Sequence, residues 1–114
     1  MIKIRFWEEH ESSSTIHMTV KGHAHTAPKG QDLVCAAATM LAYTAAQAAD
    51  SLYKQGKLAR PPRMKIRKGK CAVSVEPYAD SYAEVMTVFW TIQCGARVLS
   101  GNYPGAVALD PLSV

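Results

Sequence analysis

Long hydrophobic runs are missing from this sequence of 114 residues. No apolar run approaches the roughly 20 residues that a membrane-spanning helix needs. The first residues, MIKIRFWEEH, change from basic to acidic and do not resemble a signal peptide. These absences argue against an integral membrane protein and against an exported one. We therefore expect a cytoplasmic protein that makes no contact with a membrane.

Cysteine is also scarce. Its three copies, Cys35, Cys71 and Cys94, are widely spaced, and the sequence contains no C-x-x-C motif. This pattern implies neither a disulfide framework nor a zinc ribbon, and it is typical of the reducing cytosol. Cys71 and Cys94 fall in an expected strand and an expected helix, where we interpret them as small core residues.

Charge of one sign does not dominate the sequence. The 13 Lys and Arg exceed the nine Asp and Glu by four, and hydrophobic residues make up 48 %, as in a globular protein. We expect one domain spanning residues 1–114. A basic cluster would suit an RNA partner, but a solvated strand edge that prevents aggregation is the interpretation we favour. The cluster comprises Arg60, Arg63, Lys65, Arg67, Lys68 and Lys70.

Hydrophobic periodicity predicts the elements of the first half of the chain. Residues 2–7 and 15–20 alternate apolar and polar side chains, which indicates a β-hairpin. A helix is predicted over residues 33–55, with Asp32 as its N-cap and Gly56 at its C-terminal end. Its buried stripe is predicted to comprise Val34, Ala38, Leu41, Ala45, Ala48 and Leu52.

The second half repeats this order. Residues 64–67 and 71–76 flank a glycine turn and predict a second hairpin. Ser81 and Glu84 have the spacing of a capping box, which opens a second helix that extends to about Ser100. The order strand, strand, helix, strand, strand, helix predicts an α+β fold. We expect a two-layer sandwich in which both helices cover one face of a mainly antiparallel four-stranded sheet.

The chemically informative residues lie where the first hairpin meets the first helix. Cys35 falls in the first turn of the expected helix, where free backbone N–H groups favour the thiolate form of a cysteine. His23 follows the preceding strand and can accept the thiol proton, then donate a proton to the leaving amine. The pair is the minimum equipment of a cysteine protease, although an isolated cysteine in an alanine-rich helix is more often a small buried side chain.

A metal site is the alternative use of these residues. His25 lies two positions after His23, so both histidines and Cys35 are candidate ligands of zinc. No fourth ligand has a convincing position. We therefore expect neither a metal nor any other cofactor.

Several motifs in this region resemble the ribosomal-processing cysteine protease family, a family of small bacterial proteins. The matching residues read Gly22-His23-Ala24, Gly30, Asp32-Leu33-Val34-Cys35-Ala36-Ala37 and Thr39, with Tyr103-Pro104 after the second helix. The resemblance covers nearly the whole chain in length and element order. It implies an endopeptidase that removes a short N-terminal extension from a large-subunit ribosomal protein, after a hydrophobic motif containing aromatic residues, and it implies a homodimer.

The resemblance implies a role for each residue of this chain that matches a functional position of the family. His23 and Cys35 match the catalytic dyad, and Asp32 matches an acidic position of the family. Thr39 stands where the family usually has serine, so the hydroxyl is kept and a methyl group is added. We expect Cys35 to attack the scissile carbonyl, His23 to act as base and then acid, and Asp32 with Thr39 to position them. Backbone N–H groups at the helix start are the expected oxyanion donors.

The segment between the two motifs is predicted to cover the substrate. Gly22 and Gly30 bracket it, and their conformational freedom suits the hinges of a lid, although a plain connector needs the same two glycines.

Two other functions remain open from the sequence. One is a non-catalytic module of the same fold that binds the ribosome or RNA through the basic hairpin. The other is a phage-encoded relative that processes a capsid protein. A pure binding module has no reason to keep both His23 and Cys35, which favours the enzyme.

Overall fold

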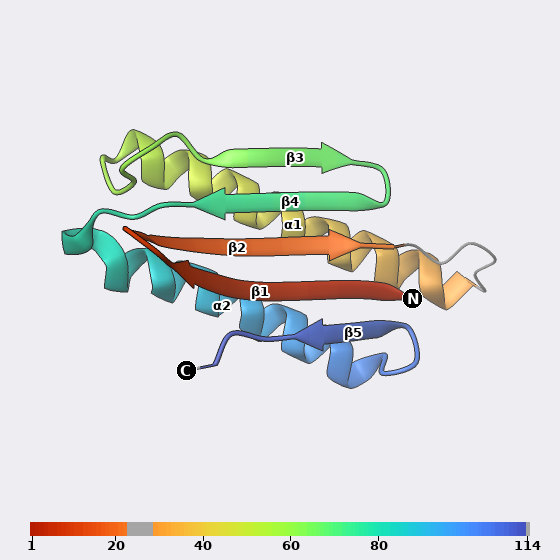
Figure 1. Ribbon diagram of the computed structural model, residues 1–114. Helices are drawn as coiled ribbons and strands as arrows, with labels where there is room; N and C mark the ends of the chain where they lie inside the picture. The colour runs from red at the N-terminus through yellow and green to blue at the C-terminus, as the bar shows by residue number, and fades with distance from the viewer. Residues whose placement is uncertain (23–28, 114) are drawn as a thin grey trace.

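A five-stranded sheet covered on one face by two helices forms the protein (Figure 1). The computed structural model describes residues 1–22 and 29–113, and the side chains of all of these except residues 29–32. Neither helix in this part of the chain is long and apolar enough to cross a membrane. In chain order the elements are β1 (Ile2–His10), β2 (Ser14–Lys21), α1 (Lys29–Lys54), β3 (Arg63–Arg67), β4 (Lys70–Val75), a 3₁₀ turn (Ala79–Ser81), α2 (Tyr82–Asn102) and β5 (Val107–Asp110).

The α+β class and both hairpins are confirmed, but the prediction of four strands was wrong. The strand order is β3-β4-β2-β1-β5, and β5 pairs with β1 in parallel, while every other neighbouring pair is antiparallel. The fifth strand has only four residues and pairs with a segment more than 100 residues away, Ile2 lying opposite Val107. Because no tight turn links the two strands, no local sequence signal announces this pairing.

The core lies between the sheet and the two helices. Side chains alternate along β1 between buried and exposed positions, and Ile4 and Phe6 are each only 1 % exposed. On α1 the buried stripe contains Ala42 and Ala49, whereas the predicted Leu41 and Ala48 are only partly buried. The prediction was therefore shifted by one residue at two of its positions. On α2 the face toward the core contains Val85, Phe89, Ile92 and Ala96, all of which are buried.

The first helix begins earlier than the sequence indicated. We expected Asp32 to cap a helix starting at Leu33, but α1 begins at Lys29. Asp32 is consequently inside the helix and is not its N-cap. Gly30 is the second helical residue, so the segment between β2 and α1 ends before it and Gly30 is not a loop hinge. At the other end the prediction is confirmed, because Gly56 follows α1 with a positive φ of 75°.

The predicted capping box at the start of α2 does not form. Ser81 makes no side-chain cap to the helix. Its hydroxyl instead donates to the backbone carbonyl of Lys57, and the ammonium group of Lys57 lies 3.0 Å from Glu84. Both members of the expected box therefore bind the connection between α1 and β3, which holds the start of α2 against that segment.

The face of the sheet opposite the helices is polar and carries an aromatic stack. The rings of Trp7 on β1 and His17 on β2 lie 4.7 Å apart and nearly parallel, and the guanidinium of Arg5 lies over the Trp7 ring. Nδ1 of His17 and the hydroxyl of Ser74 share a hydrogen bond of 2.7 Å. Burial lowers the pKa of His17, nearby arginines lower it further, and the carboxylate of Glu9 opposes them. The lowered pKa favours the neutral imidazole of His17.

Gly22, at the end of β2, occupies a position that only glycine fits. Its φ is 97°, in the region that side chains disfavour, and a Cβ atom there would collide with the backbone carbonyl of Met1. Its N–H donates to the carbonyl of Gly69 at 2.9 Å. Gly22 thus joins the end of β2 to the β3–β4 turn and to the first residue of the chain.

We predict that Gly22→Ala lowers the free energy of unfolding by more than Gly56→Ala. Both residues have a positive φ, which costs a side chain about 1–2 kcal/mol. A Cβ at Gly56 meets no atom within 4 Å, whereas one at Gly22 meets a backbone carbonyl that cannot easily move. Urea unfolding of both variants measures the difference. Equal losses would contradict the collision with Met1.

Candidate active site

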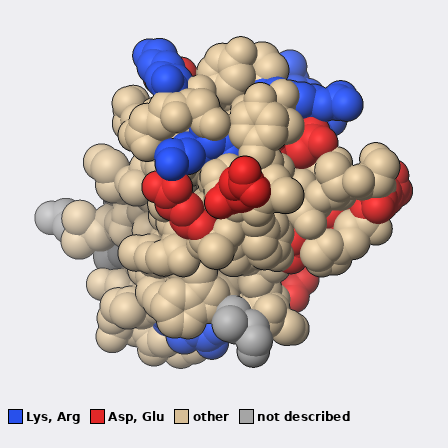
Figure 2. Space-filling model, turned by 90° about the vertical axis from the view of Figure 1, so that its left-hand side faces the viewer, with Lys and Arg blue, Asp and Glu red and all other residues tan. Residues whose placement is uncertain are grey.

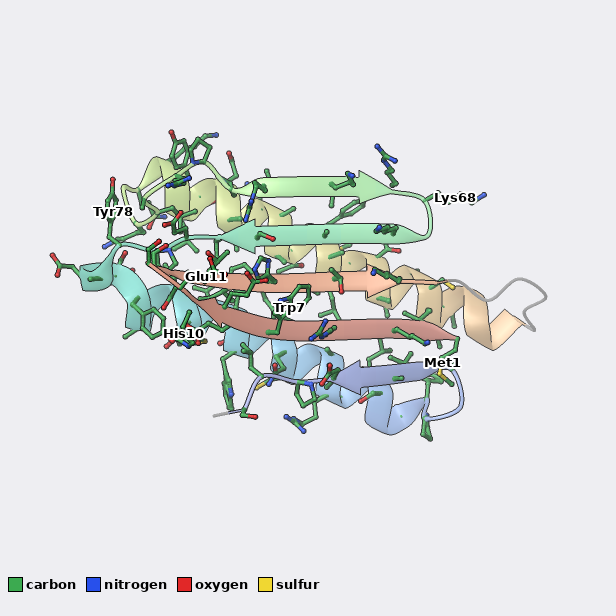
Figure 3. The ribbon with its side chains drawn as sticks, in the orientation of Figure 1. Met1, Trp7, His10, Glu11, Lys68 and Tyr78 are labelled. Atoms are coloured by element: carbon green, nitrogen blue, oxygen red, sulfur yellow. The ribbon has the colours of Figure 1, made fainter. Side chains whose placement is uncertain are left out.

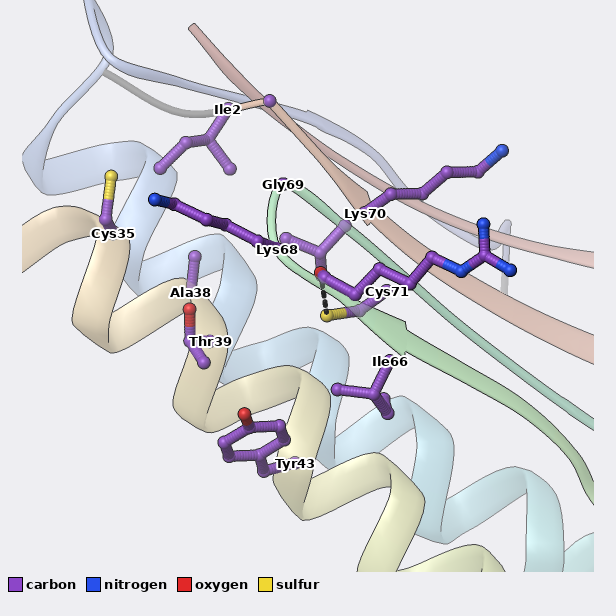
Figure 4. A pocket seen from close by; sticks show the side chains of 13 residues that line it. Ile2, Cys35, Ala38, Thr39, Tyr43, Ile66, Lys68, Gly69, Lys70 and Cys71 are labelled. Atoms are coloured by element: carbon purple, nitrogen blue, oxygen red, sulfur yellow. Dashed lines mark hydrogen bonds between the residues drawn. The ribbon is translucent and has the colours of Figure 1, made fainter. Parts of the chain in front are cut away.

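A pocket of about 770 Å³ opens where the first half of α1 approaches the ends of β1, β2 and the β3–β4 hairpin. Side chains and backbone from all four elements line it. The lining residues are Ile2, Val20, Gly22, Cys35, Ala38, Thr39, Tyr43, Ile66, Arg67, Lys68, Gly69, Lys70 and Cys71 (Figure 4). Of the predicted functional residues, Cys35 and Thr39 lie together on the α1 wall of this pocket.

The helical wall of the pocket carries a stripe of three side chains with polar or reactive groups. Cys35, Thr39 and Tyr43 follow one another at intervals of four residues, so they lie on one face of α1 (Figure 4). Cys35 is partly buried, while Thr39 and Tyr43 are exposed. Within the described residues, no hydrogen bond uses the hydroxyl of Thr39. A substrate in the pocket would therefore meet a thiol, a free hydroxyl and an aromatic ring in sequence.

The early start of α1 changes the position of Cys35 in the helix. We expected Cys35 in the first turn of the helix. Because α1 begins at Lys29, Cys35 is its seventh residue and lies in the second turn. The influence of a helix dipole falls off within the first turn, and the N–H of a residue this far along is bonded within the helix. The backbone N–H of Cys35 is therefore not a free oxyanion donor in this conformation.

The opposite wall combines apolar side chains with positive charge. Ile66 on β3 is 39 % exposed and faces the same space as Tyr43 (Figure 4). The side chain of Lys68 extends from the β3–β4 turn toward the end of α1 that carries Cys35, whereas that of Lys70 points away from the pocket (Figure 4). The charged residues lining the pocket are all basic, which suits a substrate with an exposed carbonyl or a negative group.

The other predicted site residues are placed only in part. His23, His25 and the segment between Gly22 and α1 lie outside the described residues, as does the side chain of Asp32. Gly22 lines the pocket together with Cys35. Among the residues that the structure describes, no group of three His, Cys, Asp or Glu side chains is arranged to hold a metal ion.

Sequence reasoning missed most of the residues that line the pocket, including three whose side chains face its interior. Tyr43 continues the four-residue spacing from Cys35 through Thr39, so extending the stripe by one helical turn would have found it. Ile66 and Lys68 come from the second hairpin, and only the pairing of that hairpin with β2 brings them to the pocket. Cys71 lies at the base of the pocket, where its thiol donates to the carbonyl of Arg67 at 3.8 Å, so its interpretation as a core residue is confirmed.

Solved structures with the same fold include bacterial proteases. SMU.848 from Streptococcus mutans shares 21 % identity and a TM-score of 0.67, with 100 % of this chain and 96 % of that chain covered. The essential ribosomal processing protease Prp from S. aureus, in complex with a covalently linked product peptide, shares 17 % identity and a TM-score of 0.60. The same protease with a substrate peptide shares 14 % identity and a TM-score of 0.62. For both complexes the alignment covers 97 % of this chain and 99 % of the other.

A search of curated proteins finds no match. At these identities the solved structures establish the fold. The family model for the cysteine protease Prp matches residues 1–108, which is nearly the whole chain. The match includes every residue that lines the pocket and both sequence motifs, the one at Gly22-His23 and the one at Cys35. The chain therefore belongs to the cysteine protease Prp family.

Proposed function

We propose that the protein is an endopeptidase that removes an N-terminal extension from a large-subunit ribosomal protein, with Cys35 as nucleophile and His23 as general base and acid. The observation that carries this proposal is the position of Cys35 on the wall of a pocket whose rim includes Gly22, the residue before His23. Gly22 directly precedes His23 in the sequence, and this adjacency supports the assignment of His23 as the partner of the thiol.

The reaction follows from the chemistry of the dyad. His23 takes the thiol proton, and the sulfur of Cys35 attacks the scissile carbonyl carbon to form a C–S bond. His23 returns the proton to the amine as the C–N bond breaks, which leaves a thioester on Cys35. Water, deprotonated by His23, then hydrolyses the thioester and restores the thiol. Asp32 and Thr39 are proposed to position these groups.

The walls of the pocket support a hydrophobic substrate. Its apolar lining, which includes Ile2, Tyr43 and Ile66, can receive the aromatic side chains of an extension. Burial of each large side chain stabilises the complex by roughly 1.5–3 kcal/mol. The S. aureus protease of the same fold has been seen with a substrate peptide, and we extend that use of the fold to this chain.

Replacement of the nucleophile tests the proposal. Cys35→Ala and Cys35→Ser should each abolish cleavage of a ribosomal protein that carries an N-terminal extension, because neither an alanine methyl nor an unactivated hydroxyl attacks an amide. Gel electrophoresis and mass spectrometry of the product follow the reaction, and thermal unfolding checks the fold of both variants. Cleavage by Cys35→Ala at the parent rate would refute the mechanism.

Two controls belong to this experiment. Cys71→Ala should retain cleavage, because Cys71 is buried and its thiol is already bonded to a backbone carbonyl. A chelator should leave the parent active, since the mechanism uses no metal. Loss of activity in the chelator would instead support the metal site of His23, His25 and Cys35.

Thr39 tests whether the hydroxyl next to the nucleophile takes part. Thr39→Ser keeps the hydroxyl and should retain kcat/KM within about twofold, whereas Thr39→Ala should lower it about threefold to tenfold, the range for one lost hydrogen bond of about 0.5–1.5 kcal/mol. Steady-state cleavage of one extension peptide by both variants gives the comparison. If both variants match the parent, the hydroxyl has no part in the reaction.

We propose further that two copies of the chain associate through the outer faces of α1 and α2. Residues 33–49 and 85–96 contain no charged side chain. Apolar side chains nevertheless face outward on both helices, with Met40 at 63 % and Val98, just beyond the second stretch, at 64 % exposed. The two helices pack closely, Leu41 against Gly95, so their outer surfaces adjoin. An uncharged apolar surface of this kind favours a second copy over water.

Sedimentation velocity tests this association. The parent should sediment as a dimer, and Met40→Glu with Val98→Glu should shift it to a monomer, because the variant places charges in an apolar interface. Ala108→Glu, on the exposed side of β5, adds the same charge away from the helices and should leave the dimer intact. A parent that sediments as a monomer would refute the proposal.

A further inference from the structure

Four basic side chains form a row across the uncovered face of the sheet. Lys3 on β1 pairs directly with Lys21 on β2, Lys21 with Lys70 on β4, and Lys70 with Arg67 on β3. Residues directly opposite each other point to the same face of a sheet, and their Cα atoms lie about 4.5–5.5 Å apart. The row, which we call the cationic row, therefore places four positive charges in a line roughly 15 Å long.

These charges are not neutralised within the described part of the chain. All four side chains are exposed, and the ion pairs between described residues do not include any of them. Like charges directly opposite each other destabilise a sheet. Protection of the sheet edge accounts for Arg67 on the edge strand β3, but Lys3, Lys21 and Lys70 lie on interior strands, where no edge needs protection.

Several acidic residues of the described part of the chain gather at the other end of the molecule. In Figure 3 Met1 and Lys68 mark the end of the sheet with the cationic row and the pocket, while Glu11 marks the far end. Figure 2 looks onto that far end, where several acidic side chains gather beside basic ones. The cationic row itself borders the pocket, because Arg67 and Lys70 belong to both. A partner held by the row would thus lie next to the bond that is cut.

An aromatic stack lies on the same face. Trp7 and His17 are paired on neighbouring strands, four residues along β1 and β2 from Lys3 and Lys21, or about 13 Å. His17 is only 9 % exposed and the guanidinium of Arg5 lies over the Trp7 ring, so the stack is not a free platform for bases. The exposed basic track itself suits the phosphates of a single-stranded nucleic acid.

We propose that this face of the sheet binds single-stranded RNA, with the phosphodiester backbone along the cationic row. RNA carries a negative charge at every nucleotide, so it neutralises evenly spaced cations without a special sequence. An acidic protein segment would need a matched run of carboxylates at the same spacing. The inference concerns binding alone and holds for whichever peptide the pocket cleaves.

Fluorescence anisotropy with a labelled short oligouridylate and the full-length chain tests the proposal. The logarithm of the binding constant should fall with the logarithm of salt concentration with a slope of about −3, since each of four phosphate contacts to a single strand contributes about −0.7. The double variant Lys3→Gln and Lys21→Gln should bind at least about tenfold more weakly, with roughly half that slope.

A matched variant separates the row from total charge. Lys54→Gln with Arg97→Gln removes two exposed charges from the helices and should leave RNA affinity within about twofold of the parent at a fixed salt concentration. The row variant should unfold at the same temperature as the parent or a higher one, because it relieves repulsion between Lys3 and Lys21. A peptide substrate should be cleaved by the row variant at the parent rate, because neither lysine lines the pocket.

Three results would overturn the proposal. The first is unchanged RNA affinity in the row variant, which carries Lys3→Gln and Lys21→Gln. The second is an equal loss of affinity in the helix variant, which carries Lys54→Gln and Arg97→Gln. The third is displacement of the RNA by polyglutamate at equal charge concentration, which would indicate an acidic protein as the partner. Failure of peptide cleavage by the parent would refute the proposed function and leave the RNA measurements unaffected.

Discussion

Close contact between the alanine face of α1 and the sheet is the constraint on which the rest of the structure depends. Ala38, Ala42, Ala45 and Ala49 are each at most 2 % exposed, and their small side chains let the helix backbone lie near β2 and β4. A larger side chain at these positions would lift the helix, because packed interiors tolerate added volume poorly. The same contact fixes the rotation of α1 and therefore sets the direction in which Cys35 points.

The sequence predicted those parts of the fold that depend on local patterns. Alternation in β1 and the turn glycine between β3 and β4 identified both hairpins, and Gly56 marked the end of α1. The prediction of helix starts failed, because a residue type that favours a capping position also occurs at other positions. Asp32 and Ser81 both match capping preferences, yet α1 starts before Asp32, and Ser81 binds the carbonyl of Lys57.

The candidate site was predictable only on its helical side. Cys35 and Thr39 belong to one helix, so their proximity follows from the spacing of four residues. Ile66 and Lys68 reach the pocket only because β4 pairs with β2, and sequence patterns carry no record of which strands become neighbours. The motif that pointed to His23 is local, and it needed no knowledge of the sheet order.

The parallel strand β5 has a consequence for how the chain folds. It hydrogen-bonds along β1 and also packs against α2, and the N–H of Ile2 donates to the carbonyl of Ala106 at 2.8 Å. Contacts between such distant segments close a long loop and slow folding relative to a fold made of local contacts. During synthesis, β1 emerges early and keeps one edge unpaired until β5 has left the ribosome. That open edge is the segment of the nascent chain most prone to pair with another molecule.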